Sequence, residues 1–273
     1  MGETVNETIA LTNWDLVLAG GLVLGTGGVA WVLRLGIAKR FLVAALRTVV
    51  QLSAIGFVLR QLLLEVRPDW LLLAAVVMLA AASREVHARQ RYPFRGHWGI
   101  GMGSVAMFSS TYIVTFVALS LLIQPSPWYA PRYSIPLLGM MLGNTMTGVA
   151  LGLDRLTRLA RSDRAAIEAR LSLGWPAVAA IRSARIEALR TGLVPIINSM
   201  AAAGLVSLPG MMTGQILAGN DPADAVAYQI LIMFMIASGT GLGVLASVWM
   251  GGIRLFDPRH RLRLDRLSAD SES

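Results

Sequence analysis

The alternation of long apolar segments with arginine-rich gaps is the feature that most constrains this chain. Seven apolar stretches of roughly 20 residues run along it, and a helix of that length crosses a bilayer core of about 30 Å. Every second gap is basic, and these gaps together hold 20 of the 24 lysine and arginine residues. Because cytoplasmic loops carry the excess of positive charge, the pattern predicts an N-terminus outside the cell and a cytoplasmic C-terminus.

We therefore expect an all-α integral membrane protein of the cell inner membrane with about seven transmembrane helices. The predicted spans cover residues 14–33, 41–63, 69–84, 99–123, 135–153, 195–218 and 226–250. They form a single transmembrane domain, 1–253, followed by a cytoplasmic tail, 254–273. The cytoplasmic segment 154–194, between the fifth and sixth spans, is the only sizeable stretch predicted outside the membrane.

Composition excludes several function classes. Hydrophobic residues make up 55% of the chain and charged residues 15%, which is too apolar for a water-soluble protein. The net charge of +8 alternates with the spans, so it indicates topology rather than nucleic-acid binding. We find no phosphate-binding loop, no zinc-protease motif and no acid or histidine in the middle of a span. These absences predict that the chain is not an enzyme.

The cytoplasmic segment contains a short helix with a clear stop signal. Residues 163–173 favour a helix, and Gly174 followed by Pro176 should end it before a second helix over 177–193. Glu168, Ala169 and Gly174 are similar to the E-A-A-x-x-x-G coupling motif of ABC permeases, with Arg170 in place of the third motif residue. An amphipathic surface helix and a knob for a motor subunit both remain open for this segment.

Polar and thioether side chains within the spans are the candidates for a solute path. Arg47 and Gln51 share one helical face, although Arg47 can also extend its charge to the bilayer surface. Pro209-Gly210 predicts a kink or break, either as plain structure or as an opening whose freed carbonyls line a cavity. No metal-ligand spacing is present, so no metal site is assigned. The candidate path residues are Arg47, Gln51, Asn144, Thr145, Met146, Asn198, Ser199, Met200, Pro209, Gly210 and Gln215.

Nearly the whole chain resembles the FetB family of iron-export ABC permeases, whose plant relatives are the aluminium-tolerance permeases. The match runs from the second span to the seventh, and its most specific stretch is Gly-Leu-Val-Ser-Leu-Pro-Gly-Met-Met-Thr-Gly, 204–214. The other matching segments are 47–52, 135–146, 168–174, 190–195, 218–222 and 228–230.

This resemblance implies a permease that exports iron, or a related metal or metal-linked solute, from the cytoplasm and works with a separate FetA-like ATP-binding subunit. It implies a permease homodimer in the lipid bilayer, with ATP and magnesium on the partner subunit and no cofactor in this chain. A stand-alone carrier or channel for another small solute is the alternative, and a membrane scaffold is a third hypothesis. Co-purification of an ATPase would distinguish the first hypothesis from the other two.

Overall fold

The computed structural model describes residues 12–64 and 67–268, with side chains described outside 60–66. These residues form helices joined by loops and three isolated β-bridges, with no strand among them, which confirms the all-α prediction. The chain divides into two compact units. The first runs to Arg67 and includes Leu217–Gly219, and the second comprises Pro68–Ile216 and the residues from Asn220 onward. Each unit is described by itself.

The first unit is a pair of apolar helices, α1 (Asn13–Val32) and α2 (Ala38–Leu64). Thr12 caps the start of α1, where its backbone N–H and its hydroxyl both donate to the carboxylate of Asp15. Gly27 allows α1 to approach α2 closely, because a Cβ there would lie 2.7 Å from a methyl carbon of Leu42. Most other apolar side chains of both helices are exposed, as expected for helices that contact lipid.

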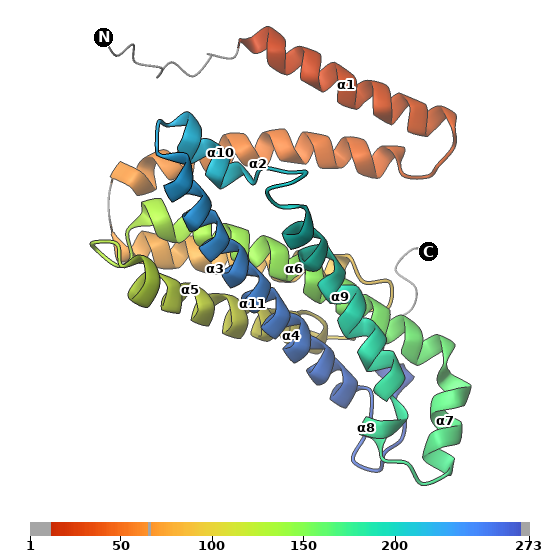
Figure 1. Cartoon of the computed structure of the whole chain (residues 1–273). Helices are drawn as coiled ribbons and strands as arrows, with labels where there is room; N and C mark the ends of the chain where they lie inside the picture. Colours follow the sequence, from red (N-terminus) through yellow and green to blue (C-terminus); the bar gives the residue numbers. More distant parts are fainter. Residues whose placement is uncertain (1–11, 65–66, 269–273) are drawn as a thin grey trace, which may run out of the picture. The chain divides into compact units, whose positions relative to one another are not determined.

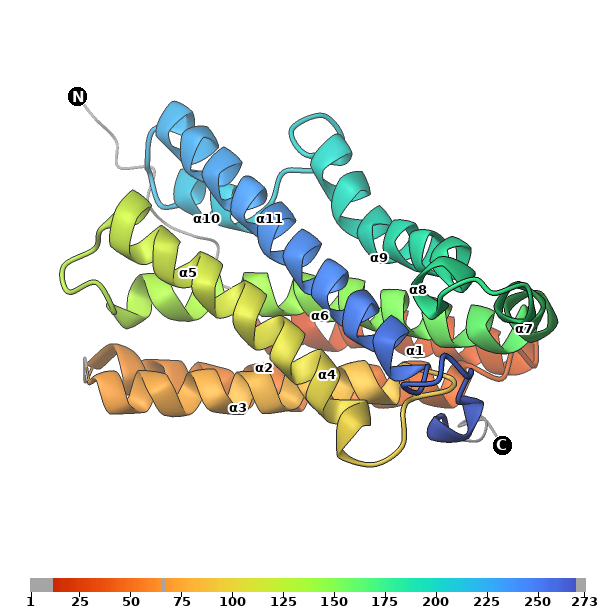
Figure 2. The ribbon, with the colours of Figure 1, turned by 90° about the horizontal axis from the view of Figure 1, so that it is seen from below.

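The second unit holds the remaining helices, drawn in Figures 1 and 2. They are α3 (Pro68–Ala88), α4 (His97–Met107), α5 (Ile113–Val117), α6 (Pro131–Ser162), α7 (Arg164–Ser172), α8 (Ala177–Ala180), α9 (Arg182–Ala202), α10 (Gly210–Leu217, whose last residue belongs to the first unit) and α11 (Pro222–Arg254). A π-helical turn, η1 (Phe108–Tyr112), joins α4 to α5, and a second, η2 (Ala118–Ile123), continues α5, so that one long helical segment runs from His97 to Ile123.

Helices α6, α9 and α11 pack side by side around glycines. A Cβ at Gly192 of α9 would lie 2.8 Å from the backbone oxygen of Gly148 on α6. The same atom would lie 2.7 Å from Cγ1 of Val244 on α11. Small residues at these crossings let the backbones approach to contact distance. The three helices therefore pack closely enough that we expect them to move together.

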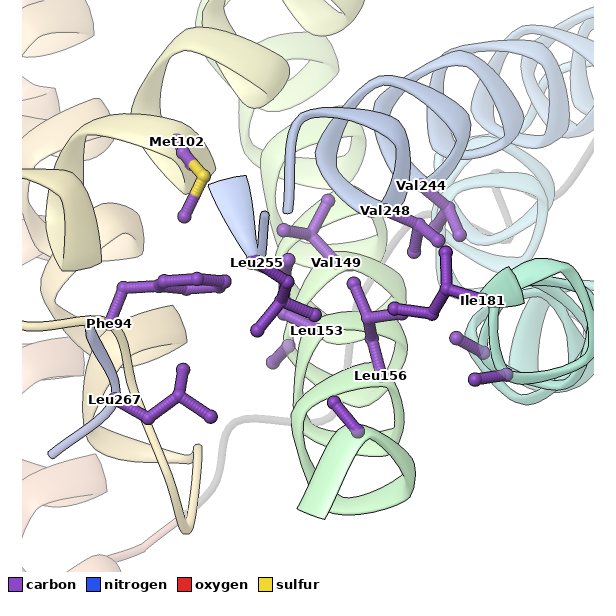
Figure 3. Packing of buried hydrophobic residues seen from close by; sticks show 14 of the residues in the cluster. Phe94, Met102, Val149, Leu153, Leu156, Ile181, Val244, Val248, Leu255 and Leu267 are labelled. Atoms are coloured by element: carbon purple, nitrogen blue, oxygen red, sulfur yellow. The ribbon is translucent and has the colours of Figure 1, made fainter. Parts of the chain in front are cut away.

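A large apolar cluster lies where the basic segments 84–95, 155–190 and 254–266 meet. We call this part of the unit its arginine-rich end. In Figure 3, Leu156 of α6 points toward Ile181, whereas Leu153 lies beside Leu255, on the side of Phe94. Phe94, in the loop after α3, and Leu267, near the C-terminus, complete the cluster, and each is only 1% exposed.

The segment after α11 is part of the fold. The predicted tail begins at 254, but residues 255–268 pack back onto the bundle end, and a short 3₁₀ turn, η3, spans Leu264–Arg266. Nη1 of Arg266 donates to the backbone oxygens of Arg254 at 2.7 Å and Phe256 at 3.0 Å, which satisfies carbonyls at the end of α11. Residues 269–273 of the predicted tail lie outside the described residues.

A buried carboxylate organises the turn in this segment. Asp257 accepts hydrogen bonds from the backbone N–H groups of Arg259 and Arg261 and from Nε of Arg261. The backbone hydrogen bond from Arg261 is the main reason that the pKa of Asp257 is lowered from its ordinary value.

The helix boundaries differ from the predicted spans mainly around span six. Six described helical segments are long and apolar enough to cross a membrane. The predicted sixth span, 195–218, is instead the end of α9, a non-helical stretch and α10. The expected end of a helix at 193 is wrong, because α9 continues through Pro195 to Ala202 while Gly192 and Ile196 pack against the neighbouring helices.

Candidate functional site

The candidate coupling turn forms where the sequence predicts it. Helix α7 ends at Ser172, and Gly174 follows with φ +84°, a conformation that side chains with a Cβ rarely adopt. The N–H groups of Gly174 and Trp175 donate to the carbonyls of Leu171 and Arg170 at 2.9 and 3.1 Å. This arrangement closes the end of the helix and turns the chain into α8.

Arg170, the residue that departs from the coupling motif, fastens this turn. Its Nη1 donates to the backbone oxygen of Ala180 at 2.9 Å and to Oγ of Ser183 at 3.2 Å. The guanidinium thus ties α7 to the end of α8 and the start of α9. A methyl group at this position would lose both contacts.

The α7–α8 segment, residues 164–180, has an anchored face and an exposed face, and we call it the knob. Ile167 is buried in the apolar cluster, at 1% exposure. On the other face, Leu173 is 78% exposed, Trp175 is 50% exposed and Val178 is 53% exposed. Apolar side chains gathered at the polar end of a membrane protein are typical of a site that a partner covers.

Glu168 and Ala169, the motif residues, lie on the knob surface. Glu168 is half-buried and accepts from Nε of Arg164 at 2.8 Å, one helical turn earlier. Ala169 is exposed. The carboxylate of Glu168 therefore has one cationic neighbour and keeps acceptor capacity for a docked protein.

Side-chain contacts connect α6, α9 and α11 with one another near the knob. Arg155 of α6 pairs with Glu187 of α9 at 3.2 Å. Arg185 of α9 stacks over the Trp249 ring of α11 at 4.0 Å, in space left open by Gly252. Burial lowers the pKa of Arg185 below its ordinary value, because the charged guanidinium loses water there. The knob itself joins these helices through Ile167, which packs in the apolar cluster with residues of α6, α9 and α11.

The predicted break at Pro209-Gly210 is confirmed and is longer than the sequence indicated. Helix α9 ends at Ala202, the chain is non-helical over 203–209, and α10 begins at Gly210 (Figure 2). Gly204 adopts φ +82°, and its N–H donates to the Ser207 carbonyl at 2.9 Å. At membrane depth, such backbone is tolerated only against protein or a water-filled cavity.

Several candidate path residues lie next to this break. Asn198, Ser199 and Met200 are exposed on the last turns of α9. Pro209 and Gly210 form its far end, and Gln215 is half-buried on α10. The structure therefore brings most of the sixth-span candidates to one region of the chain.

The fifth-span candidates divide between two sides of α6. Nδ2 of Asn144 donates to the Met140 carbonyl of its own helix at 2.8 Å, and its side chain is half-buried. Thr145 is fully buried and accepts a long, 3.5 Å hydrogen bond from the hydroxyl of Thr111. Met146 packs against the apolar cluster. A path role for these residues stays a prediction.

Arg47 and Gln51 lie on α2 of the first unit, and both side chains are exposed. Their role in a path also stays a prediction. Gln229 and Thr240 of α11, which are not among the predicted path residues, are buried polar residues of the second unit. Gln229 is 7% exposed and Thr240 is 1% exposed. Both lie within an apolar span, which is the signal that could have marked them.

The donors available around these helices are mainly neutral. Over 12–64 and 67–268, no three His, Cys, Asp or Glu side chains converge in an arrangement that would hold a metal ion. A solute near the break would meet amide oxygens, hydroxyls, thioethers and backbone carbonyls.

Comparisons with known proteins agree on one family. Residues 13–256 match the family described as uncharacterised protein family UPF0014. A UPF0014 membrane protein of Synechocystis sp. is 40% identical over 89% of this chain and 86% of its own length. Protein ALUMINUM SENSITIVE 3 of Arabidopsis thaliana is 31% identical, with 82% and 80% covered. The probable iron export permease protein FetB of Escherichia coli is 30% identical, with 94% and 97% covered. No solved structure matches the chain.

Proposed function

Because this chain belongs to the UPF0014 family of membrane proteins, with a probable iron export permease among its relatives, we propose that it is the permease subunit of an ABC transporter. It is a multi-pass membrane protein, and its family indicates a transporter rather than an enzyme. In the proposed complex, a separate FetA-like subunit binds and hydrolyses ATP with magnesium, and two permease chains form a homodimer. The complex lies in the cell inner membrane, and its arginine-rich end faces the cytoplasm.

The observation that carries the proposal is the knob. Its inner face is anchored in the bundle through Ile167, while its outer face presents Leu173, Trp175 and Val178. An ATP-binding subunit that drives transport must bind the permease and transmit its own movement to it. A protrusion with a fixed base and an apolar surface allows both. Contacts through Arg155 and Arg185 would pass that movement between α6, α9 and α11.

Iron export is the cargo and direction that the FetB similarity favours. A cation leaving the cytoplasm must be released on the far side. Neutral oxygens of Asn144, Asn198 and Gln215 suit this, because carboxylates would hold a hard cation more tightly. The break over 203–209 would supply carbonyls that replace water around the cargo and would let the sixth span bend.

Purification of the chain with its ATPase tests the proposal directly. We expect a nucleotide-binding subunit to co-purify, and we expect ferrous or ferric iron to stimulate ATP hydrolysis by the reconstituted complex. Iron transport by the purified chain alone, without ATP, would instead establish a stand-alone carrier or channel.

The path assignment has its own test. Asn144→Leu and Pro209→Ala should each abolish iron-stimulated ATP hydrolysis while the complex still assembles. Pro136→Ala is the matched control, since Pro136 is an exposed proline inside α6, where the helix continues without a break. Parental iron export by both variants would show that the break serves packing only.

A further inference from the structure

A half-open apolar groove lies between α4 and α11 at the arginine-rich end of the second unit. Its volume is about 180 Å³. Five of its lining residues come from α4 and one from α11, and they are His97, Trp98, Gly101, Met102, Val105 and Met250. The proposed transport cycle gives this groove no role.

A guanidinium group lies at one end of this groove. Arg254 follows Met250 by four residues on α11, so both side chains lie on the same helical face. The Arg254 guanidinium stacks over the ring of Trp98 at 4.6 Å, and Trp98 itself lines the groove. Apolar lining and a fixed positive charge therefore adjoin on one surface.

The nearby acidic groups are already engaged by other arginines. Asp257 pairs with Arg261 at 2.7 Å, and Asp265 pairs with Arg263 at 2.8 Å. Arg263 and Arg266 are close enough to repel the charge of Arg254. Among the described residues, Arg254 forms no ion pair, so an added anion would complete the local charge balance.

We propose that this groove binds one anionic phospholipid from the leaflet at the arginine-rich end, with its phosphate on Arg254 and an acyl chain along α4. The groove lies on helices apolar enough to cross a membrane, where acyl chains surround the protein. A free phosphate would satisfy Arg254 but would leave the apolar lining uncovered. Trp98 suits the boundary between the two parts of the lipid, because its ring stacks with the guanidinium and borders the apolar space. The proposal goes beyond the transport function and does not depend on it.

Native mass spectrometry of the purified full chain in detergent tests the site. The probes are palmitoyl-oleoyl phosphatidylglycerol, the matching phosphatidylcholine, and glycerol phosphate as the headgroup alone. Both lipids carry the phosphate, but only phosphatidylcholine also carries a quaternary ammonium, which Arg254 and the neighbouring arginines would repel. We therefore expect one phosphatidylglycerol to bind at least about tenfold more tightly than phosphatidylcholine. Equal binding of the two lipids would overturn the assignment, and glycerol phosphate binding as tightly as the lipid would show a soluble-anion site instead.

Two variants separate the charge from the groove. Arg254→Gln should remove the preference for phosphatidylglycerol, whereas Arg259→Gln, which removes an exposed charge from the same terminal segment, should keep it. Gly101→Leu should weaken both lipids, because a Cβ at Gly101 enters open space in the groove without a clash. Gly241→Leu is its control on α11, also in open space but outside the groove.

Lipid-free melting temperatures establish that each variant is folded. If Arg254→Gln and Gly101→Leu are folded and bind phosphatidylglycerol as the parent does, the groove is covered by another part of the protein or by a second copy, and the proposal is wrong.

Discussion

Replacement of Gly174 offers the sharpest test of the knob. Glycine is favoured at this position by the backbone conformation and not by a lack of space for a side chain. Gly174 adopts φ +84°, and a Cβ built on it meets nothing within 4 Å. A larger residue there is therefore not excluded by a clash. Its cost comes from the left-handed backbone conformation alone.

The expected magnitude follows from this geometry. An L-residue in the left-handed region costs about 1–2 kcal/mol, and asparagine costs less. Gly174→Ala and Gly174→Leu should therefore have similar effects, since neither side chain meets a neighbour. A penalty of this size shifts the equilibrium between the native turn and distorted turns by a factor of about 5–30. The bundle should stay folded, because Ile167 anchors α7 independently of the turn.

The assay is the affinity of the detergent-solubilised permease for its ATP-binding subunit, measured with iron-stimulated ATP hydrolysis. We expect Gly174→Ala and Gly174→Leu to weaken association by about 5–30-fold and to reduce stimulation, with Gly174→Asn between them and the parent. Parental affinity and stimulation in the leucine variant would refute the reasoning. An asparagine variant as weak as the alanine variant would show that backbone conformation is not the cause.

Three further outcomes test the rest of the fold. Single cysteines at Ser126 and Ser162 should react with an impermeant reagent from opposite sides of the membrane in intact cells, and labelling of both from outside would disprove the topology. Gly192→Ala should destabilise the detergent-solubilised protein by about 1–3 kcal/mol, because its Cβ would press on backbone, whereas Gly143→Ala, which meets open space, should not lower the melting temperature. The lowered pKa of Asp257 means that its carboxylate stabilises the segment 255–268 at neutral pH and loses that effect as the pH falls below the ordinary value of 3.8; hydrogen exchange in this segment should rise in acid, and Asp257→Asn should raise it at neutral pH.

The lengths of the apolar segments and the stop signal at Gly174 and Pro176 predicted most of the helices and the turn after α7. The predicted helix over 163–173 corresponds to α7, which packs on the apolar cluster through Ile167 and Leu171, and Gly174 forms the turn after it as expected. These features are local, so the chain itself encodes them within a few residues. The knob's exposed apolar face was not predicted, because a periodic pattern does not say which side a partner covers.

Features that depend on contacts between distant parts of the chain were not predicted, or were predicted to be shorter than they are. Pro209 marked the break, but its full length also needs the left-handed Gly204, which the sequence analysis did not single out. The packed segment 255–268 looked like a polar tail, since its apolar residues are scattered among arginines. Leu267 is buried in the apolar cluster, where Phe94, far away in the chain, lies opposite it.

The path candidates show the same limit at single-residue resolution. Asn144 and Thr145 are adjacent polar residues of the same predicted span, so the sequence gives no reason to prefer one as a path residue. In the structure, Thr145 is fully buried and Asn144 is half-buried. Their difference is set by the rotation of α6 against α11, where a Cβ at Gly243 would lie 2.5 Å from a carbon of Thr145. Composition cannot supply that rotation.

The packed C-terminal segment has a consequence for biosynthesis. Leu267 and Arg266 follow α11 in the chain, yet they close the apolar cluster and satisfy carbonyls at the end of that helix. The ribosome makes these residues after all the helices that they contact, so this end of the bundle cannot close before they emerge. Closure of the cluster is therefore a late step in the folding of the second unit.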